Sequence, residues 1–119
     1  MNVLVIDGEA LLLDIWLRLY KDLSYNTFSA YDGFEGVKAL KQESINLVII
    51  DIKMPNADGY YVLNYLKGEH QEVITAIVCS VYVDNEESSL APYQIARVIR
   101  KLFSFSDEFL YFQNFMSNQ

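Results

Sequence analysis

The chain is poor in the residues on which several functional classes depend. Among 119 residues it has one cysteine, Cys79, and one histidine, His70. A single cysteine excludes an intramolecular disulfide and any multi-cysteine zinc site. A Ser-His-Asp triad would have to include His70, which lies in the polar stretch 68–71 and for which we expect no role. A histidine-based metal site is not expected either.

Cations and long apolar runs are also scarce. Nine Lys and Arg stand against sixteen Asp and Glu, which gives a net charge of −7. Because so acidic a surface repels phosphate backbones and anionic lipids, we expect no direct contact with nucleic acid or membranes. The run Ala10 to Leu13 is as long as any apolar run and far too short to span a bilayer, and no signal peptide is visible. These features favour a cytoplasmic protein.

The composition favours one folded domain over residues 1–119. The chain is 52% apolar and 21% charged, which is apolar enough to bury a core and too apolar for disorder. Apolar runs of strand length occupy residues 2–6, 26–30, 46–50, 73–80 and 95–100. Helical periodicity follows over 9–21, 33–42, 58–67 and 106–116, with a short helix from Asp84 that Pro92 limits.

This alternation predicts an α/β fold, a doubly wound five-stranded parallel sheet with helices on both faces. The runs around Val5, Ile49 and Ile77 are continuously apolar, as expected of central strands covered on both sides. The spacing predicts three core-facing helix stripes: Leu12, Trp16 and Leu19; Phe34, Val37 and Leu40; and Tyr61, Val62 and Tyr65.

Polar residues follow the predicted strands, and the carboxyl ends of parallel strands meet at one edge. They are Asp7, Glu9, Asp51, Ser80 and Lys101. Gathered carboxylates repel one another without a cation, and oxygen ligands favour Mg²⁺, which recruits phosphate. Asp51 is the central candidate to act as nucleophile toward phosphorus, with the Ser80 hydroxyl and the Lys101 ammonium contacting phosphoryl oxygens. The alternatives are that Asp7 and Glu9 cap the first helix, that Asp51 is a strand-end cap and that Lys101 is a solvated lysine.

Residues 46–59, NLVIIDIKMPNADG, contain a complete Asp-x-x-Met-Pro-x-x-Asp-Gly motif. This segment resembles the phosphoacceptor segment of response-regulator receiver domains of two-component signalling. Residues 31–35, Tyr-Asp-Gly-Phe-Glu, resemble the family's entry to its second helix, and Lys101 with Phe103 resembles its Lys-Pro-Phe. The resemblance runs from Asn2 to about Met116 and implies a flavodoxin-like, receiver-type fold.

The resemblance implies a role for each strand-end residue. Asp51 matches the phosphorylated aspartate, Ser80 and Lys101 match the residues that contact the phosphoryl group, and Asp7 matches the first acid of the metal cluster. Glu9 and the backbone carbonyl of Lys53 match further groups around a bound Mg²⁺. The implied donor is a histidine kinase or a phosphotransfer protein, and the implied receiver is a downstream protein or output domain. Such a domain is not an enzyme, beyond its own phosphorylation and dephosphorylation.

Three departures from the family pattern leave a second hypothesis open. Gly8 stands where the family has a second acid that binds the metal directly, so Mg²⁺ binding is expected to be weakened or absent. Val98 stands at the aromatic switch position, and Pro92 shortens the fourth helix. These departures favour the alternative of a pseudo-receiver, a protein-interaction module that works without phosphorylation. Enzyme hypotheses fare worse, because a dehalogenase-type phosphatase would need its nucleophile at Val5 and no Gly-rich nucleotide loop follows a strand.

The C-terminal helix is rich in aromatic residues. Phe109, Phe112 and Met116 share one face, whereas Tyr111 and Phe115 point elsewhere. Exposed aromatic pairs mark interfaces, so this helix is a candidate surface for a partner or a homodimer. The alternative is that neighbouring side chains cover the pair.

Overall fold

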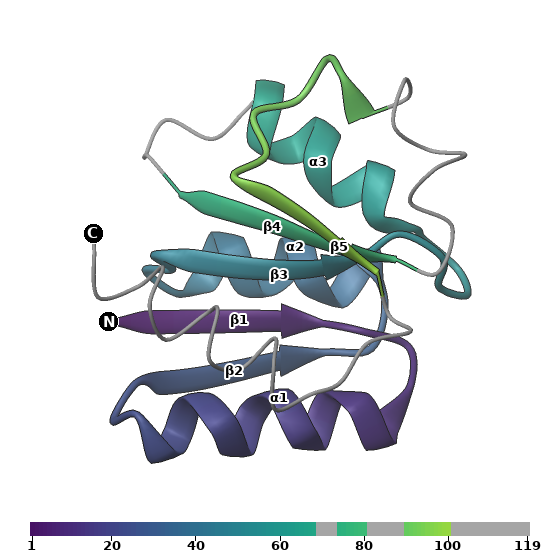
Figure 1. The fold of residues 1–119 in the computed structure, drawn as a ribbon. Coiled ribbons are helices and arrows are strands. Elements are labelled where there is room, and N and C mark those ends of the chain that lie inside the picture. Colours follow the sequence, from purple (N-terminus) through teal and green to yellow (C-terminus); the bar gives the residue numbers. More distant parts are fainter. Residues whose placement is uncertain (69–73, 81–89, 101–119) are drawn as a thin grey trace.

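A computed structural model describes residues 1–68, 74–80 and 90–100 of the chain. The elements along these residues are β1 (Asn2–Ile6), α1 (Ala10–Asp22), β2 (Asn26–Ala30), α2 (Gly33–Gln42), β3 (Leu47–Asp51), α3 (Gly59–Gly68), β4 (Thr75–Ser80) and β5 (Arg97–Arg100). The strands form one parallel sheet in the order β2-β1-β3-β4-β5 (Figure 1). The predicted doubly wound, flavodoxin-like sheet is therefore confirmed.

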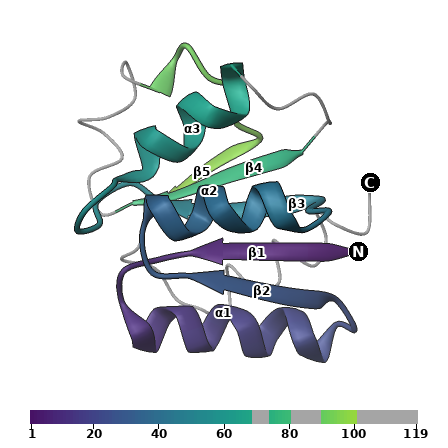
Figure 2. The same cartoon turned by 180° about the vertical axis from the view of Figure 1, so that it is seen from behind.

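The sheet separates two layers of core. Alternate residues of a strand point to opposite faces, so Leu4 and Ile6 face α2 and α3, while Val3 and Val5 face α1. On the first face, Val37 and Leu40 of α2 and Val62 and Leu63 of α3 pack against the strands. Figure 2 shows α2 and α3 on one side of the sheet, and the prediction of helices on both faces is confirmed.

The predicted inner face of α1 is shifted by one residue. The helix buries Leu13, Trp16 and Tyr20, whereas Leu12 and Leu19 are only half-buried. The first half of α1 is apolar nearly all round, so leucine spacing alone does not fix which stripe meets the sheet. Stacking of Trp16 with Tyr20, at 6.4 Å between ring centroids, accompanies the observed face.

Two aromatic residues predicted for the core are exposed. Phe34 is 54% exposed and Tyr61 is 44% exposed. The buried face of α2 includes Gly36, where a Cβ atom would lie 2.5 Å from the Cδ1 of Ile6. A helix that approaches a strand this closely uses glycine at the contact. The spacing of large apolar side chains therefore identifies Val37 and Leu40, which are buried, but wrongly adds Phe34 to their face.

The strand boundaries differ from the prediction by a few residues. Asp51 is the last residue of β3 rather than the residue after it, and β5 begins at Arg97. The predicted short helix after Asp84 and the predicted helix 106–116, with Tyr111 and Phe115, lie outside the described residues.

Candidate functional site

Two buried carboxylates lie at the carboxyl edge of the sheet. Asp7 follows β1 and Asp51 ends β3, and they are only 2% and 4% exposed. β2 lies on one side of β1, and β3, the next strand along the chain, lies on the other side. The direction in which strands are added to the sheet therefore reverses between β1 and β3. Ile6 pairs with Ile50, which brings Asp7 opposite Asp51 at this switch point. Ligands of doubly wound sheets bind in the crevice at such a point.

The turn after β1 is held by Asp7. Its backbone N–H donates to the Ala30 carbonyl at 3.1 Å, and its Oδ1 accepts from the Glu9 N–H at 2.8 Å. Glu9 occupies the N-cap position of α1, yet its side chain accepts no capping hydrogen bond. Glu9 therefore does not cap α1 through its side chain, whereas Asp7 holds the backbone N–H of the N-cap residue.

The neighbouring strand extends this edge. Asp51 pairs with Cys79 of β4, so Ser80, the next and last residue of β4, also lies at the carboxyl edge. Cys79 is a small buried residue, as its sequence context predicts. Ser80 itself pairs with Arg100, the last residue of β5. Lys101 comes directly after Arg100 but lies outside the described residues, so its role stays a prediction.

The loop that follows Asp51 is fixed by hydrogen bonds to its surroundings. The Ala57 carbonyl accepts from the Gly33 N–H at 2.8 Å, and the Ile52 carbonyl accepts from the Gly59 N–H at 2.9 Å. Asn56 adopts a left-handed backbone with φ of 67°, and its side-chain amide donates to Asp32 Oδ2 at 3.0 Å. Lys53, whose carbonyl is a predicted metal ligand, belongs to this loop.

Asp32 joins this loop to the start of α2. Its Oδ1 accepts from the Glu35 N–H at 2.9 Å, which caps the helix, and its other oxygen accepts from Asn56. The hydrogen bond from the Glu35 N–H, supported by that from Asn56, lowers the pKa of Asp32 below its ordinary value. The Asp-x-x-Glu pattern of a capping box was the sequence signal for the cap. Nothing in the sequence signals the contact with Asn56, 24 residues away.

Asp58 caps the start of α3. Asp58 Oδ1 accepts from the Tyr61 N–H at 3.2 Å, at the start of α3. The Asp-Gly pair of the motif thus starts a helix, and no role as a metal ligand is needed to explain Asp58.

Gly8 faces the same loop. A Cβ atom at this position would lie 3.3 Å from Pro55 Cδ and 3.6 Å from Met54 Cγ. The backbone of Gly8 is not in the left-handed region, so the conformation does not require glycine. A side chain at position 8 would therefore point toward the segment that follows Asp51.

The donor set of this edge suits a hard cation. Among the described residues, no three His, Cys, Asp or Glu side chains form a group that could hold a metal ion. The oxygen donors at the switch point are the buried carboxylates of Asp7 and Asp51, with the Lys53 carbonyl two residues further along. Mg²⁺ commonly binds through one or two carboxylates and keeps several waters, so these oxygen donors are of the kind that Mg²⁺ takes.

A family model described as the response regulator receiver domain matches residues 3–107. The probable transcriptional regulator ycf27 of Porphyridium aerugineum is 40% identical over 68 residues, which are 57% of this chain and 28% of that protein. The sensor kinase/phosphatase CqsS of Vibrio cholerae is 27% identical over 93 residues, 78% of this chain and 14% of that protein. The chain thus spans less than a third of either relative.

Solved structures share the fold. A receiver domain protein from Methanospirillum hungatei aligns with a TM-score of 0.81 at 22% identity, over 98% of this chain and 94% of that one. The response regulator TrrA of Thermotoga maritima, in complex with Mg²⁺-BeF, aligns with a TM-score of 0.80 at 22% identity, over 95% and 96%. In the part of this chain that the structure describes, no helix has the length and apolar character to cross a membrane.

Proposed function

The chain belongs to the response regulator receiver domain family, and from that premise we propose that Asp51 accepts a phosphoryl group from a histidine kinase or a phosphotransfer protein. The observation that carries the proposal is the pair of buried carboxylates, Asp7 and Asp51, at the switch point of the sheet. Two adjacent buried anions repel each other, and a bound cation with a phosphoryl group would give that arrangement a purpose.

The proposed step is a displacement at phosphorus. A carboxylate oxygen of Asp51 attacks the phosphorus of a phosphohistidine, the P–N bond breaks, and the imidazole nitrogen keeps the electron pair. The product is an aspartyl phosphate, which water later hydrolyses. Ser80 would donate its hydroxyl proton to a phosphoryl oxygen, and Lys101 would pair its ammonium with another.

Asp7, Asp51 and the Lys53 carbonyl would hold Mg²⁺, with Glu9 acting through water. When bound, the ion offsets negative charge on the transferring group. The structure of TrrA in complex with Mg²⁺-BeF supports this assignment for the family. Because Gly8 supplies no carboxylate, we expect weaker Mg²⁺ binding than in members with two adjacent acids.

The phosphorylated state is proposed to signal through a changed protein interaction in the cytoplasm. The relatives include a sensor kinase and a transcriptional regulator, which supports a kinase as donor and an output domain or downstream protein as receiver. The domain is a signalling module and not a classical enzyme. A homodimer through the helix predicted over 106–116 remains part of the proposal.

The second candidate is a pseudo-receiver, favoured by the missing acid at Gly8. Intact mass after incubation with acetyl phosphate and Mg²⁺ separates the two, with Asp51→Asn as the acceptor control. We expect an adduct on the parent that Asp51→Asn lacks. Absence of an adduct on the parent together with its appearance on Gly8→Asp would favour the pseudo-receiver, and absence from both would overturn the phosphoacceptor assignment.

Matched substitutions at position 8 test the metal site. Gly8→Asp should tighten Mg²⁺ binding roughly tenfold, or about 1.4 kcal/mol, whereas the neutral, nearly isosteric Gly8→Asn should not. Isothermal titration calorimetry with Mg²⁺ measures the affinity of both variants. Equal affinities in the two variants would show that position 8 does not face the ion.

A further inference from the structure

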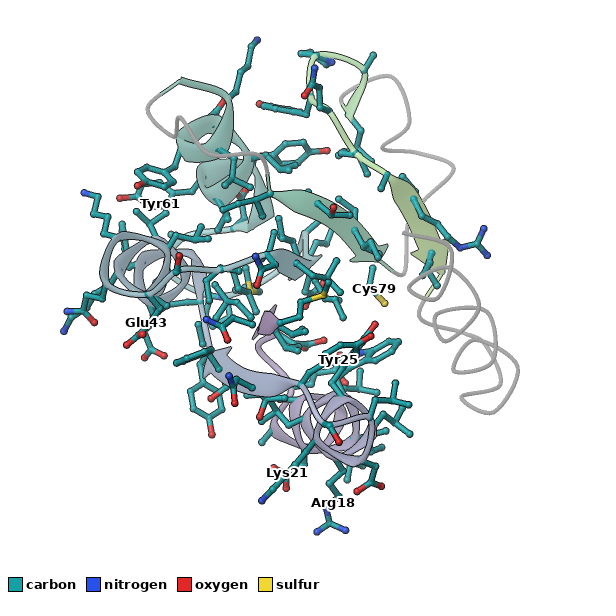
Figure 3. The ribbon with its side chains drawn as sticks, turned by 90° about the vertical axis from the view of Figure 1, so that its left-hand side faces the viewer. Arg18, Lys21, Tyr25, Glu43, Tyr61 and Cys79 are labelled. Atoms are coloured by element: carbon teal, nitrogen blue, oxygen red, sulfur yellow. The ribbon has the colours of Figure 1, made fainter. Side chains whose placement is uncertain are left out.

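Exposed aromatic side chains gather where α2 and α3 begin. Tyr31, Phe34 and Tyr61 are 52%, 54% and 44% exposed. The rings of Phe34 and Tyr61 meet edge to face, with centroids 5.0 Å apart and planes at 77°. Figure 3 shows Tyr61 on the outer side of α3, next to α2. This pair crosses the seam between the two helices, on the face turned away from the sheet.

Lysines continue the same seam. Lys38 and Lys41 lie four and seven residues after Phe34, so the three share one stripe of α2. Tyr65 lies one turn after Tyr61 on α3, and the Lys41 Nζ is 5.7 Å from its ring centroid. We call Phe34, Lys38, Lys41, Tyr61 and Tyr65 the α2–α3 stripe.

The charge along the stripe is opposite to that of the chain. The α2–α3 stripe holds Lys38 and Lys41 and no acid, within a chain of −7, while Glu35, Glu43 and Asp58 stand at the ends of the two helices. Lys67 belongs to another side of α3, because its Nζ lies 5.6 Å from the centroid of the Tyr93 ring. The Glu35 carboxylate also accepts the Tyr31 N–H at 3.0 Å. By contrast, α1 carries two cations and two acids, Arg18 and Lys21 with Asp14 and Asp22. The α2–α3 stripe is thus a small cationic strip on an acidic chain, to which acidic partners are attracted.

We propose that the α2–α3 stripe docks an acidic protein segment that carries aromatic or aliphatic side chains. Exposed aromatic rings supply the contact area, and the lysines pair with carboxylates at its rim. Nucleic acid is disfavoured because the remaining surface is strongly acidic. This docking does not depend on phosphorylation of Asp51.

Three fluorescein-labelled peptides of equal length test the proposal by anisotropy at low salt: repeats of Glu-Glu-Leu-Phe, of Glu-Glu-Ser-Asn and of Lys-Lys-Leu-Phe. We expect the first to bind the full chain best, with amide NMR shifts confined to α2 and α3. The double variant Lys38→Glu/Lys41→Glu should weaken binding roughly tenfold or more. Phe34→Ser/Tyr61→Ser should weaken it similarly, and thermal melts verify that both variants remain folded.

The matched control is Arg18→Glu/Lys21→Glu on α1, which changes the net charge equally. Figure 3 shows both side chains at the outer edge of α1, on the far side of the molecule from α3. This control should bind the peptide as well as the parent does. If it loses as much affinity as Lys38→Glu/Lys41→Glu, the effect comes from overall charge and the proposal is overturned. No preference for Glu-Glu-Leu-Phe would also overturn the proposal. So would binding of labelled oligothymidine, or self-association of the parent that the stripe variants abolish.

Discussion

Gly59 supports the end of β3, and Gly59→Ala tests how tightly the phosphoacceptor edge is packed. A Cβ atom at Gly59 would lie 2.6 Å from the Asp51 carbonyl oxygen, 2.8 Å from the Ile52 Cα and 3.0 Å from the Ile50 Cγ2. The two closest atoms belong to the backbone, so no side-chain rotation relieves the clash. The Gly59 N–H also donates to the Ile52 carbonyl, which ties α3 to the same strand end.

The cost follows from two opposing terms. Overpacking a core contact costs about 1–3 kcal/mol, and replacing glycine by alanine in a helix returns about 0.5–1 kcal/mol. We therefore expect Gly59→Ala to lower the free energy of unfolding by about 1–2 kcal/mol. Because relief requires the end of β3 to move, phosphoryl acceptance by Asp51 should fall as well.

Gly68→Ala is the matched control at the other end of α3. No atom of the described residues lies within 4 Å of a Cβ atom there, so this variant should be neutral or stabilised by up to about 0.5 kcal/mol. Urea unfolding followed by the fluorescence of Trp16, which is the single tryptophan and is buried, measures both variants. Equal stability of Gly59→Ala and Gly68→Ala would refute the packing argument.

Two further predictions concern pH. The hydrogen bonds that lower the pKa of Asp32 contribute stability above its unfolded pKa of about 3.9, and this contribution is lost as the pH falls through the lower folded value. Urea unfolding from about pH 6 to pH 2.5 should therefore show the parent losing more stability than Asp32→Asn. A difference in unfolding free energy between the two proteins that does not change with pH would contradict this. Burial, with the nearby Tyr25, raises the pKa of Tyr20, so its contribution is complete below about pH 10 and is lost as the pH rises through the folded value. Raising the pH above about 10 should lower the free energy of unfolding of the parent more than that of Tyr20→Phe. Parallel plots of this free energy against pH would show that Tyr20 does not ionise on unfolding.

The strands were predictable because a strand that is buried on both faces consists of consecutive apolar residues. Val3 to Ile6 and Leu47 to Ile50 are continuous apolar runs, and each ends at an acid that reaches the edge of the sheet. Parallel strands then bring Asp7 and Asp51 to the same edge of the sheet, and the observed strand order, with β1 beside β3, places the two residues opposite each other. The shared edge of the candidate site could therefore be predicted from the order of elements, whereas the adjacency of its two carboxylates could not.

Contacts that depend on close approach between helices, strands and loops could not be predicted. The inner face of α2 is set by Gly36 against Ile6, and glycine carries no apolar signal. The hydrogen bond between Asn56 and Asp32 joins two turns whose distance apart is fixed only by the completed fold. The exposure of Phe34 and Tyr61 was missed for a related reason: α2 buries Gly36 beside Val37 and Leu40, and α3 buries Leu63 beside Val62, so the large aromatic side chains are left at the margins of the buried faces.

The missing acid at position 8 is a property of the sequence and not of the fold. If the backbone there were left-handed, or if the loop after Asp51 filled the space, only glycine would be tolerated and weak metal binding would be built into this architecture. Instead the backbone is ordinary, and the nearest obstacle to a Cβ atom is the Pro55 ring at 3.3 Å, which need move by only a few tenths of an ångström. Hydrogen bonds from Gly33 to Ala57 and from Asn56 to Asp32 hold the rest of the loop in place. An added carboxylate at position 8 would therefore stay near the switch point. A single substitution, Gly8→Asp, should therefore restore an acid without rebuilding the site, and its comparison with Gly8→Asn isolates the carboxylate charge from the added volume.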